Sequence, residues 1–95
     1  MAEQREVLPQ SMVVEFAYPV TMKGEEVTQI TIRKPKMKDM KAMASVSGTD
    51  LDREAWLMSC LSGMPVSDFD NLDLDQYQRV QEVLGKYTAS SMMTI

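Results

Sequence analysis

The chain has 95 residues, of which 44% are hydrophobic and 25% are charged, a composition typical of one soluble globular domain with a modest core. The formal net charge of −4 argues against a surface that grips nucleic acid throughout, because such binding depends on basic side chains that meet phosphates. No apolar run is long enough to span a membrane, the N-terminus lacks a signal-peptide core, and the single cysteine cannot form an internal disulfide. These features predict a single cytoplasmic domain.

The first third of the chain predicts a β-hairpin. Residues 1–11 show no hydrophobic period and predict a flexible leader. In residues 12–33 apolar side chains alternate, which is the pattern of strands with one buried face. One face of the first strand consists of Met12, Val14, Phe16 and Tyr18. One face of the second strand contains Ile30 and Ile32. Gly24 can take the positive φ that a tight turn requires, and Pro19 suits an edge or a bulge.

Residues 36–87 predict three helices. The first follows Pro35 and runs through "KMKDMKAMASV"; the second starts at Asp50 or Asp52 and ends at Gly63 and Pro65. Its apolar stripe consists of Leu57, Cys60, Leu61 and Met64. The third helix, 74–87, has one apolar face made of Tyr77, Val80, Val83, Leu84 and Tyr87, and residues 88–95 predict a flexible tail. The fold class is therefore α+β, an N-terminal hairpin with three helices packed on it, because a two-stranded sheet alone is marginal.

Four aspartates in "SDFDNLDLDQY" raise the question of a metal site, namely Asp68, Asp70, Asp73 and Asp75. A calcium loop that starts at Asp68 would need an oxygen ligand where Leu72 stands and a glycine where Asp73 stands. The chain contains no histidine, so the usual zinc ligand sets cannot be assembled in one copy. We therefore predict capping, with Ser67 capping a short turn and Asp73 capping the last helix in a capping box closed by Gln76. Neither a metal nor a cofactor is predicted.

The chain also lacks the residues of common catalytic sets. It has no histidine, no glycine-rich phosphate loop and no serine in a recognisable nucleophile setting. Asp68 and Asp70 could do acid and base work, but the sequence shows no partner for them. Cys60 lies on the apolar stripe of the second helix, which predicts a buried, inert thiol. The sequence thus predicts a protein that is not an enzyme.

Two features point to partner binding. Ten of the residues are methionine, a flexible side chain that suits adaptable surfaces, although core packing is the plainer explanation of each one. The candidate partner-binding residues are Met37, Met40, Met43, Trp56 and Met58. A basic cluster spans residues 33–41 and contains Arg33, Lys34, Lys36, Lys38 and Lys41. It is either a solvated rim or a docking patch for an acidic partner, a second copy of the chain or nucleic acid.

Several short motifs, in this order and spacing, resemble the small tail assembly chaperones of contractile-tailed bacteriophages. The resemblance covers residues 12–87 and lies in "YPVTMKGEEVTQITIRKP" and "LSGMPVSDFDNLDLDQYQRV". The matching positions are Pro19 with Val20, Gly24, Arg33 with Pro35, Leu61 with Gly63 and Pro65, and Leu72 with Asp75. Most of them are turn, cap and core residues, so they support the fold better than they locate a site.

The resemblance implies a protein of the infected host's cytoplasm that is absent from the mature virion. Its expected partners are the tape measure protein, whose helices it would keep soluble, and the tail tube protein, together with a frameshifted longer form of itself. No nucleic acid or membrane partner is expected, and self-association is left open. Two alternatives remain: a small DNA-binding regulator that uses residues 33–41, and a structural component of the tail.

Overall fold

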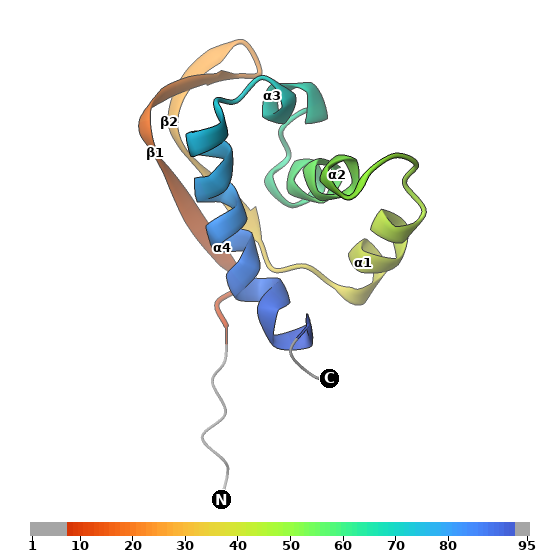
Figure 1. Cartoon of the computed structure of the whole chain (residues 1–95). Coiled ribbons are helices and arrows are strands. Elements are labelled where there is room, and N and C mark those ends of the chain that lie inside the picture. The colour runs from red at the N-terminus through yellow and green to blue at the C-terminus, as the bar shows by residue number, and fades with distance from the viewer. Residues whose placement is uncertain (1–7, 93–95) are drawn as a thin grey trace, which may run out of the picture.

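The computed structural model describes the backbone of residues 8–92 and the side chains of residues 8–88. Two strands are followed by four helices (Figure 1), in the order β1 (Ser11–Met22), β2 (Glu25–Arg33), α1 (Met37–Ala44), α2 (Asp50–Ser62), α3 (Val66–Asp70) and α4 (Leu74–Met92). The predicted α+β class is confirmed, with an N-terminal hairpin and helices after it. The segment predicted as a connection contains one further short helix, α3.

The hairpin turn has the conformation that the glycine predicted. The strands are antiparallel, and the two residues between them, Lys23 and Gly24, have φ angles of 56° and 77°. Positive φ at both positions matches the right-handed twist of the flanking strands, which is why such turns favour glycine. The Lys23 N–H donates to the Asp68 carboxylate at 2.9 Å. The hairpin tip is thereby tied to α3.

β1 contains an irregularity at the predicted place. Glu15 pairs with Gln29 and Val20 pairs with Val27, so residues 16–19 of β1 lie opposite the single residue Thr28. Pro19 lies in this bulge, where its missing N–H costs no ladder hydrogen bond. The bulge also turns Tyr18 outward: its side chain is 41% exposed, whereas Val14 is 1% exposed. The prediction that Tyr18 shares the buried face is wrong because the bulge interrupts the alternation, which resumes at Val20 and Met22.

Gln76 of α4 supplies hydrogen bonds to the bulge of β1. Its side chain is fully buried; Oε1 accepts from the Ala17 N–H at 3.0 Å and Nε2 donates to the Tyr18 carbonyl at 3.1 Å. The predicted capping box between Asp73 and Gln76 is therefore wrong, since the glutamine amide faces the strand rather than its own helix end. Gln76 thereby supplies hydrogen-bond partners to two backbone groups of the bulge.

The other helix ends follow ordinary capping chemistry. α2 begins at Asp50 as predicted, but the cap is Thr49, whose hydroxyl accepts from the Asp52 N–H at 3.2 Å. Gly63 ends α2 with a φ of 77°, which confirms the predicted glycine stop. α3 begins after Pro65, so Ser67 lies inside its first turn and the prediction of Ser67 as a cap is wrong. α1 ends at Ala44, earlier than the predicted end at Val46.

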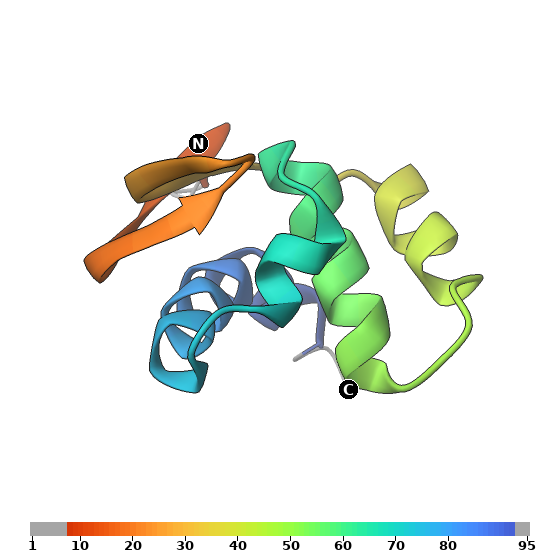
Figure 2. The same ribbon diagram turned by 90° about the horizontal axis from the view of Figure 1, so that it is seen from above.

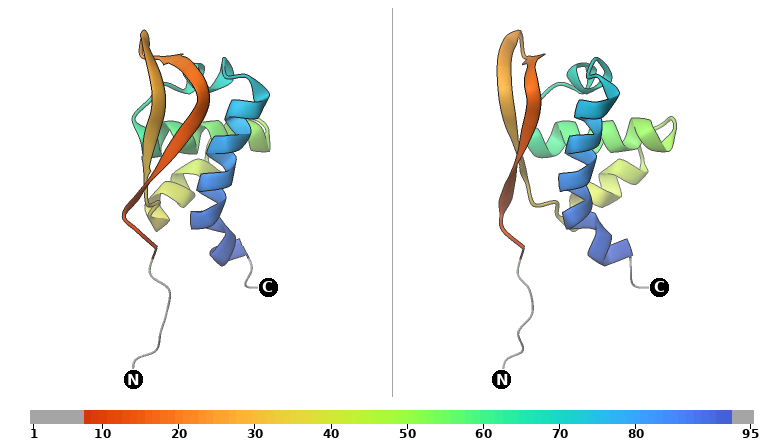
Figure 3. Two further views of the ribbon diagram at one scale, coloured as in Figure 1. Left: turned by 90° about the vertical axis from the view of Figure 1, so that its left-hand side faces the viewer. Right: turned by 60° about the vertical axis from the view of Figure 1, so that its left-hand side comes forward.

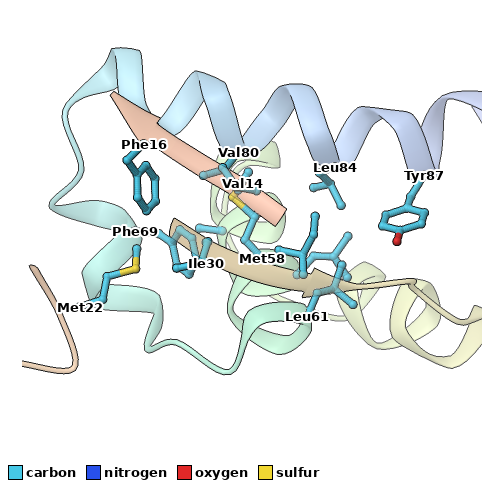
Figure 4. Close-up of a cluster of buried hydrophobic side chains, with 13 residues drawn as sticks. Val14, Phe16, Met22, Ile30, Met58, Leu61, Phe69, Val80, Leu84 and Tyr87 are labelled. Carbon is cyan, nitrogen blue, oxygen red and sulfur yellow. The ribbon is translucent and has the colours of Figure 1, made fainter. Parts of the chain in front are cut away.

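The helices cover one face of the hairpin. In the left view of Figure 3, α4 runs beside β1 and α2 crosses behind the hairpin. Figure 2 shows α1 packed on the side of α2 that faces away from the hairpin. Figure 4 shows Val80, Leu84 and Tyr87 pointing from successive turns of α4 toward the strands. The buried core takes side chains from both strands and from α2, α3 and α4, namely Val14, Phe16, Met22, Ile30, Ile32, Ala55, Leu57, Met58, Leu61, Phe69, Val80, Leu84 and Tyr87. The opposite face of the hairpin is exposed, with Val13 48% accessible.

The described structure reaches into the segments predicted as a flexible leader and a flexible tail. Leu8 packs against the core, and the Pro9 carbonyl accepts from the Tyr87 hydroxyl at 2.8 Å. The prediction of a flexible leader is therefore wrong for residues 8–11, and residues 1–7 lie outside the described part. α4 continues to Met92, so a tail that starts at residue 88 is also wrong, while residues 93–95 lie outside the described part.

Candidate protein-binding site

The aspartates of the connection hold the fold together. Asp68 accepts from the backbone of the hairpin tip, and the Tyr18 hydroxyl donates to Asp73 at 2.5 Å and to Asp75 at 3.2 Å. Within residues 8–92, no group of three or more histidine, cysteine, aspartate or glutamate side chains is arranged to hold a metal ion. These aspartates instead accept hydrogen bonds from the hairpin.

Cys60 is exposed, which overturns the prediction of a buried thiol. The buried residues of α2 are Ala55, Leu57, Met58 and Leu61, so the core-facing stripe of the helix leaves position 60 to one side. Burial of its surroundings still raises the pKa of the Cys60 thiol. A raised pKa disfavours the reactive thiolate.

A groove of about 280 Å³ lies between α1, α2 and α4. Its lining consists of Met40, Met43, Asp50, Arg53, Glu54, Leu57, Leu84 and Thr88. Four of these eight residues are apolar, and the charged ones form its rim. The arrangement can receive an apolar side chain of a partner while polar groups of that partner meet the rim.

The two methionines of the groove come from one face of α1. Met40 and Met43 are three residues apart, so their side chains are neighbours on the helix surface. Both are half-buried and pack against the core, whereas Leu57 and Leu84 are 2% and 4% exposed and form the floor. Each methionine thus has one side in contact with the core and the other side available. Such a thioether side chain can change rotamer to fit different partners.

The rim of the groove is held by hydrogen bonds between side chains. Arg53 Nη1 lies 3.2 Å from Asp50 Oδ1. The Tyr77 hydroxyl and Gln81 Nε2 each donate to Glu54 Oε1 at 2.8 Å, which ties α2 to α4. Burial and the hydrogen bond to Glu54 raise the pKa of the Tyr77 hydroxyl, so it remains a protonated donor. The glutamate is thereby fixed in orientation.

The five predicted partner-binding residues do not form one surface. Met40 and Met43 line the groove, and Met37 is 69% exposed on α1. Trp56 is half-buried against the core and does not line the groove. Met58 is fully buried, so it cannot meet a partner without unfolding, and we assign it to the core. Sequence reasoning missed Leu57 and Leu84 as groove residues because it assigned the stripes of both helices wholly to the core.

The basic cluster is partly used within the fold. Arg33 forms two hydrogen bonds with Asp39, from Nη1 at 2.9 Å and from Nη2 at 3.0 Å, and Asp39 also accepts from the Lys36 N–H at 2.7 Å. The Arg33 guanidinium and the Lys36 N–H lower the pKa of Asp39 to about 2. Lys34 Nζ lies 3.4 Å from the Leu8 carbonyl. The exposed cations that remain at α1 are Lys36, Lys38 and Lys41.

A second apolar surface was not predicted. Leu51 and Leu74 are 62% and 69% exposed and line one hollow of about 230 Å³ near the starts of α2 and α4. Each leucine stands between two aspartates, in the repeated triplet "DLD". The triplet is the signal that could have found this surface, because a leucine in the first turn of a helix beside two charged residues is placed to face water.

No helix within residues 8–92 is long and apolar enough to cross a membrane. The helices that back the hairpin leave an apolar groove, which has the chemistry to receive an apolar side chain of a protein partner. The chain belongs to the phage tail assembly chaperone proteins described as "E, or 41 or 14", whose family model matches residues 13–88. The chain matches no curated protein and no solved structure.

Family membership assigns the chain a role in phage tail assembly. The match extends from Val13, the third residue of β1, to Thr88 in α4, so it includes nearly all of the hairpin and every residue that lines the groove. The predicted family is confirmed at the level of tail assembly chaperones. A chaperone of assembly acts through protein partners, and this is in keeping with a non-catalytic protein.

Proposed function

We propose that this chain binds the tape measure protein of a contractile-tailed phage in the host cytoplasm and keeps it soluble until tail tube subunits surround it. The observation that carries the proposal is the groove, in which Met40 and Met43 lie half-buried above Leu57 and Leu84. An amphipathic helix of the client would place one apolar side chain in the groove, as in other helix-in-groove complexes. The chaperone then leaves before the virion is complete.

The charges around the groove suit a client with mixed charge. Asp50 and Glu54 lie on the α2 side, and Lys38 and Lys41 are exposed on α1. Contacts of this kind set orientation and association rate more than affinity. One groove of this size gives weak binding, so several copies along one long client would act together through multivalency. Weak individual contacts also allow release when the tube replaces the chaperone.

The test is co-expression of the tagged chain with the tape measure protein of the same genome. We expect the wild type to retain the tape measure in a pull-down and to raise its soluble fraction. The double substitution Met40→Asp and Met43→Asp should remove at least about 90% of the retained client, since it places charge in an apolar groove. The milder pair Met40→Ala and Met43→Ala should weaken retention in a protein whose circular dichroism is unchanged.

A matched control uses the other apolar surface. Leu51→Asp and Leu74→Asp make the same chemical change at two exposed leucines outside the groove. We expect this variant to retain the client. Equal loss in both pairs would contradict the assignment to the groove, and no retention by the wild type would contradict tape measure binding itself. Detection of the chain in purified virions would instead favour a structural tail component.

A further inference from the structure

The backbone groups of the two outer edges of the hairpin differ in whether other parts of the chain bind them. On β1, the bulge at residues 16–19 interrupts the edge, Gln76 takes the Ala17 N–H and the Tyr18 carbonyl, and Arg79 Nη1 lies 3.3 Å from the Glu15 carbonyl. These are the means by which natural sheets prevent pairing with another strand. The β1 edge is closed by α4.

The β2 edge carries none of these protections. Among the described residues the sheet has the order β1-β2, so the other edge of β2 has no strand beside it. β2 is nine residues long, contains no proline and pairs with β1 without a bulge over Gln29–Arg33. Its exposed central side chains, Thr28, Gln29 and Thr31, are uncharged. An edge of this kind accepts another strand readily.

The charges of β2 indicate which strand it accepts. Its sequence begins with Glu25 and Glu26 and ends with Arg33, followed by Lys34. An antiparallel copy of β2 brings the acidic end of one strand beside the basic end of the other, at both ends of the pair. Opposite charges directly across two strands stabilise the pairing, and like charges, which a parallel copy would bring together, destabilise it.

We propose that the chain forms a symmetric dimer by antiparallel pairing of β2 with β2 of a second copy, centred on Gln29. This register places Glu25 opposite Arg33 of the partner copy, twice. It keeps the exposed positions Gln29 and Thr31 on one face of the joined sheet and the buried positions Ile30 and Ile32 on the other. Arg33 keeps its bonds to Asp39, since a guanidinium has five N–H donors and its side chain is 43% exposed.

The pairing makes one four-stranded sheet from two hairpins. A two-stranded sheet is marginal on its own, whereas four strands with helices on one face form an ordinary sheet. The interface is isologous and closed, so it ends at two copies instead of growing into a fibre. Both methionine grooves remain outside the joined edge, because their lining comes from α1, α2 and α4. A dimer would thus present two grooves to one client.

The first experiment measures the mass of the purified full-length chain by analytical ultracentrifugation over a roughly hundredfold range of concentration. We expect a reversible dimer. The pair Glu25→Lys and Glu26→Lys should raise the dimer dissociation constant at least about tenfold, because it sets a lysine opposite Arg33 at each end of the pairing and removes the acidic charge beside it. The control is Glu82→Lys, the same change at an exposed glutamate of α4, which should leave the dissociation constant unchanged.

The second experiment tests the register by oxidation, with Cys60→Ser as the background. In that background Gln29→Cys should form a disulfide-linked dimer, since residues opposite each other have Cα atoms about 4.5–5.5 Å apart, within disulfide reach. The control Thr31→Cys should not, because two such cysteines would lie about 13 Å apart along the strands.

A monomer at all concentrations would overturn the proposal. A dimer that survives Glu25→Lys with Glu26→Lys, and does not crosslink through Gln29→Cys, would also overturn it and place the contact on another surface. The tape measure protein is absent from both experiments, so their failure leaves the proposed client binding unaffected.

Discussion

The two strands of the hairpin differ in how their outer edges are protected from pairing with another strand. β1 is bulged at its proline, and α4 supplies Gln76 and Arg79 to its backbone. β2 is regular over its second half and is unpaired on its far side within the described chain. The difference teaches that α4 does more than cover the core: its polar side chains close the sheet on one side only. Substitutions at each edge can test this asymmetry.

The largest effect is expected at Gln76, on the closed edge. Gln76→Leu keeps a side chain of similar size but leaves the Ala17 N–H and the Tyr18 carbonyl without partners. A hydrogen bond of this kind contributes about 0.5–1.5 kcal/mol, so the loss of two should lower the free energy of unfolding by roughly 1–3 kcal/mol. Urea denaturation followed by circular dichroism measures the change.

Gln78→Leu is the matched control for this experiment. Gln78 lies on the same helix but is exposed, so its replacement should change the free energy of unfolding by less than about 0.5 kcal/mol. If the two variants lost equal stability, Gln76 would not be a specific partner of the bulge and the closed edge would need another explanation.

Much of the hairpin could be predicted because its signals are local. Gly24 determines a turn between two adjacent strands, and Pro19 marks the bulge, so both follow from nearby sequence. Gln76 could not be assigned from local sequence. It stands three residues after Asp73, which is the spacing of a capping box, and only the approach of β1, 59 residues away in the chain, shows that its amide serves another element. Tertiary contacts overrode a correct local pattern.

The candidate site was predicted in part for the same reason. Spacing along α1 placed Met40 and Met43 on one face, but it could not show whether that face meets the core, solvent or both. Met58 looks equivalent in sequence and is fully buried, because α2 turns this side chain toward the sheet. The groove depends on the position of α4 against α1 and α2, which no local pattern encodes.

A moderate effect is expected at Asp39, which attaches the end of β2 to α1. Arg33 and the Lys36 N–H hold the pKa of Asp39 at about 2, below its usual 3.8. A lowered pKa means that the folded state favours the carboxylate, so this stabilisation is present above about pH 4 and is lost as the pH falls toward 2. Asp39→Asn should reduce stability by about 1–2 kcal/mol at pH 7, allowing for the partial exposure of Arg33.

The pH dependence separates this ion pair from a packing effect. The difference between Asp39→Asn and the wild type should shrink when urea denaturation is repeated at decreasing pH between 5 and 2. Asp70→Asn, at an exposed aspartate of α3, provides the control. A difference that stayed constant with pH would mean that Asp39 acts through packing, and that β2 is attached to α1 without help from its charge.

The smallest effect is expected at Tyr18, the exposed part of the β1 bulge. Its hydroxyl donates to Asp73 and Asp75, and the hydrogen bond to Asp73 raises the pKa of this phenol above its usual 10.0. A raised pKa means that the folded state favours the protonated phenol, so the stabilisation is present below pH 10 and is lost as the pH rises above it. Because solvent screens this exposed group, Tyr18→Phe should barely lower the urea midpoint at pH 7, and the two midpoints should converge at higher pH. A large loss at pH 7 would show that this exposed bond, and not the buried amide of Gln76, closes the β1 edge.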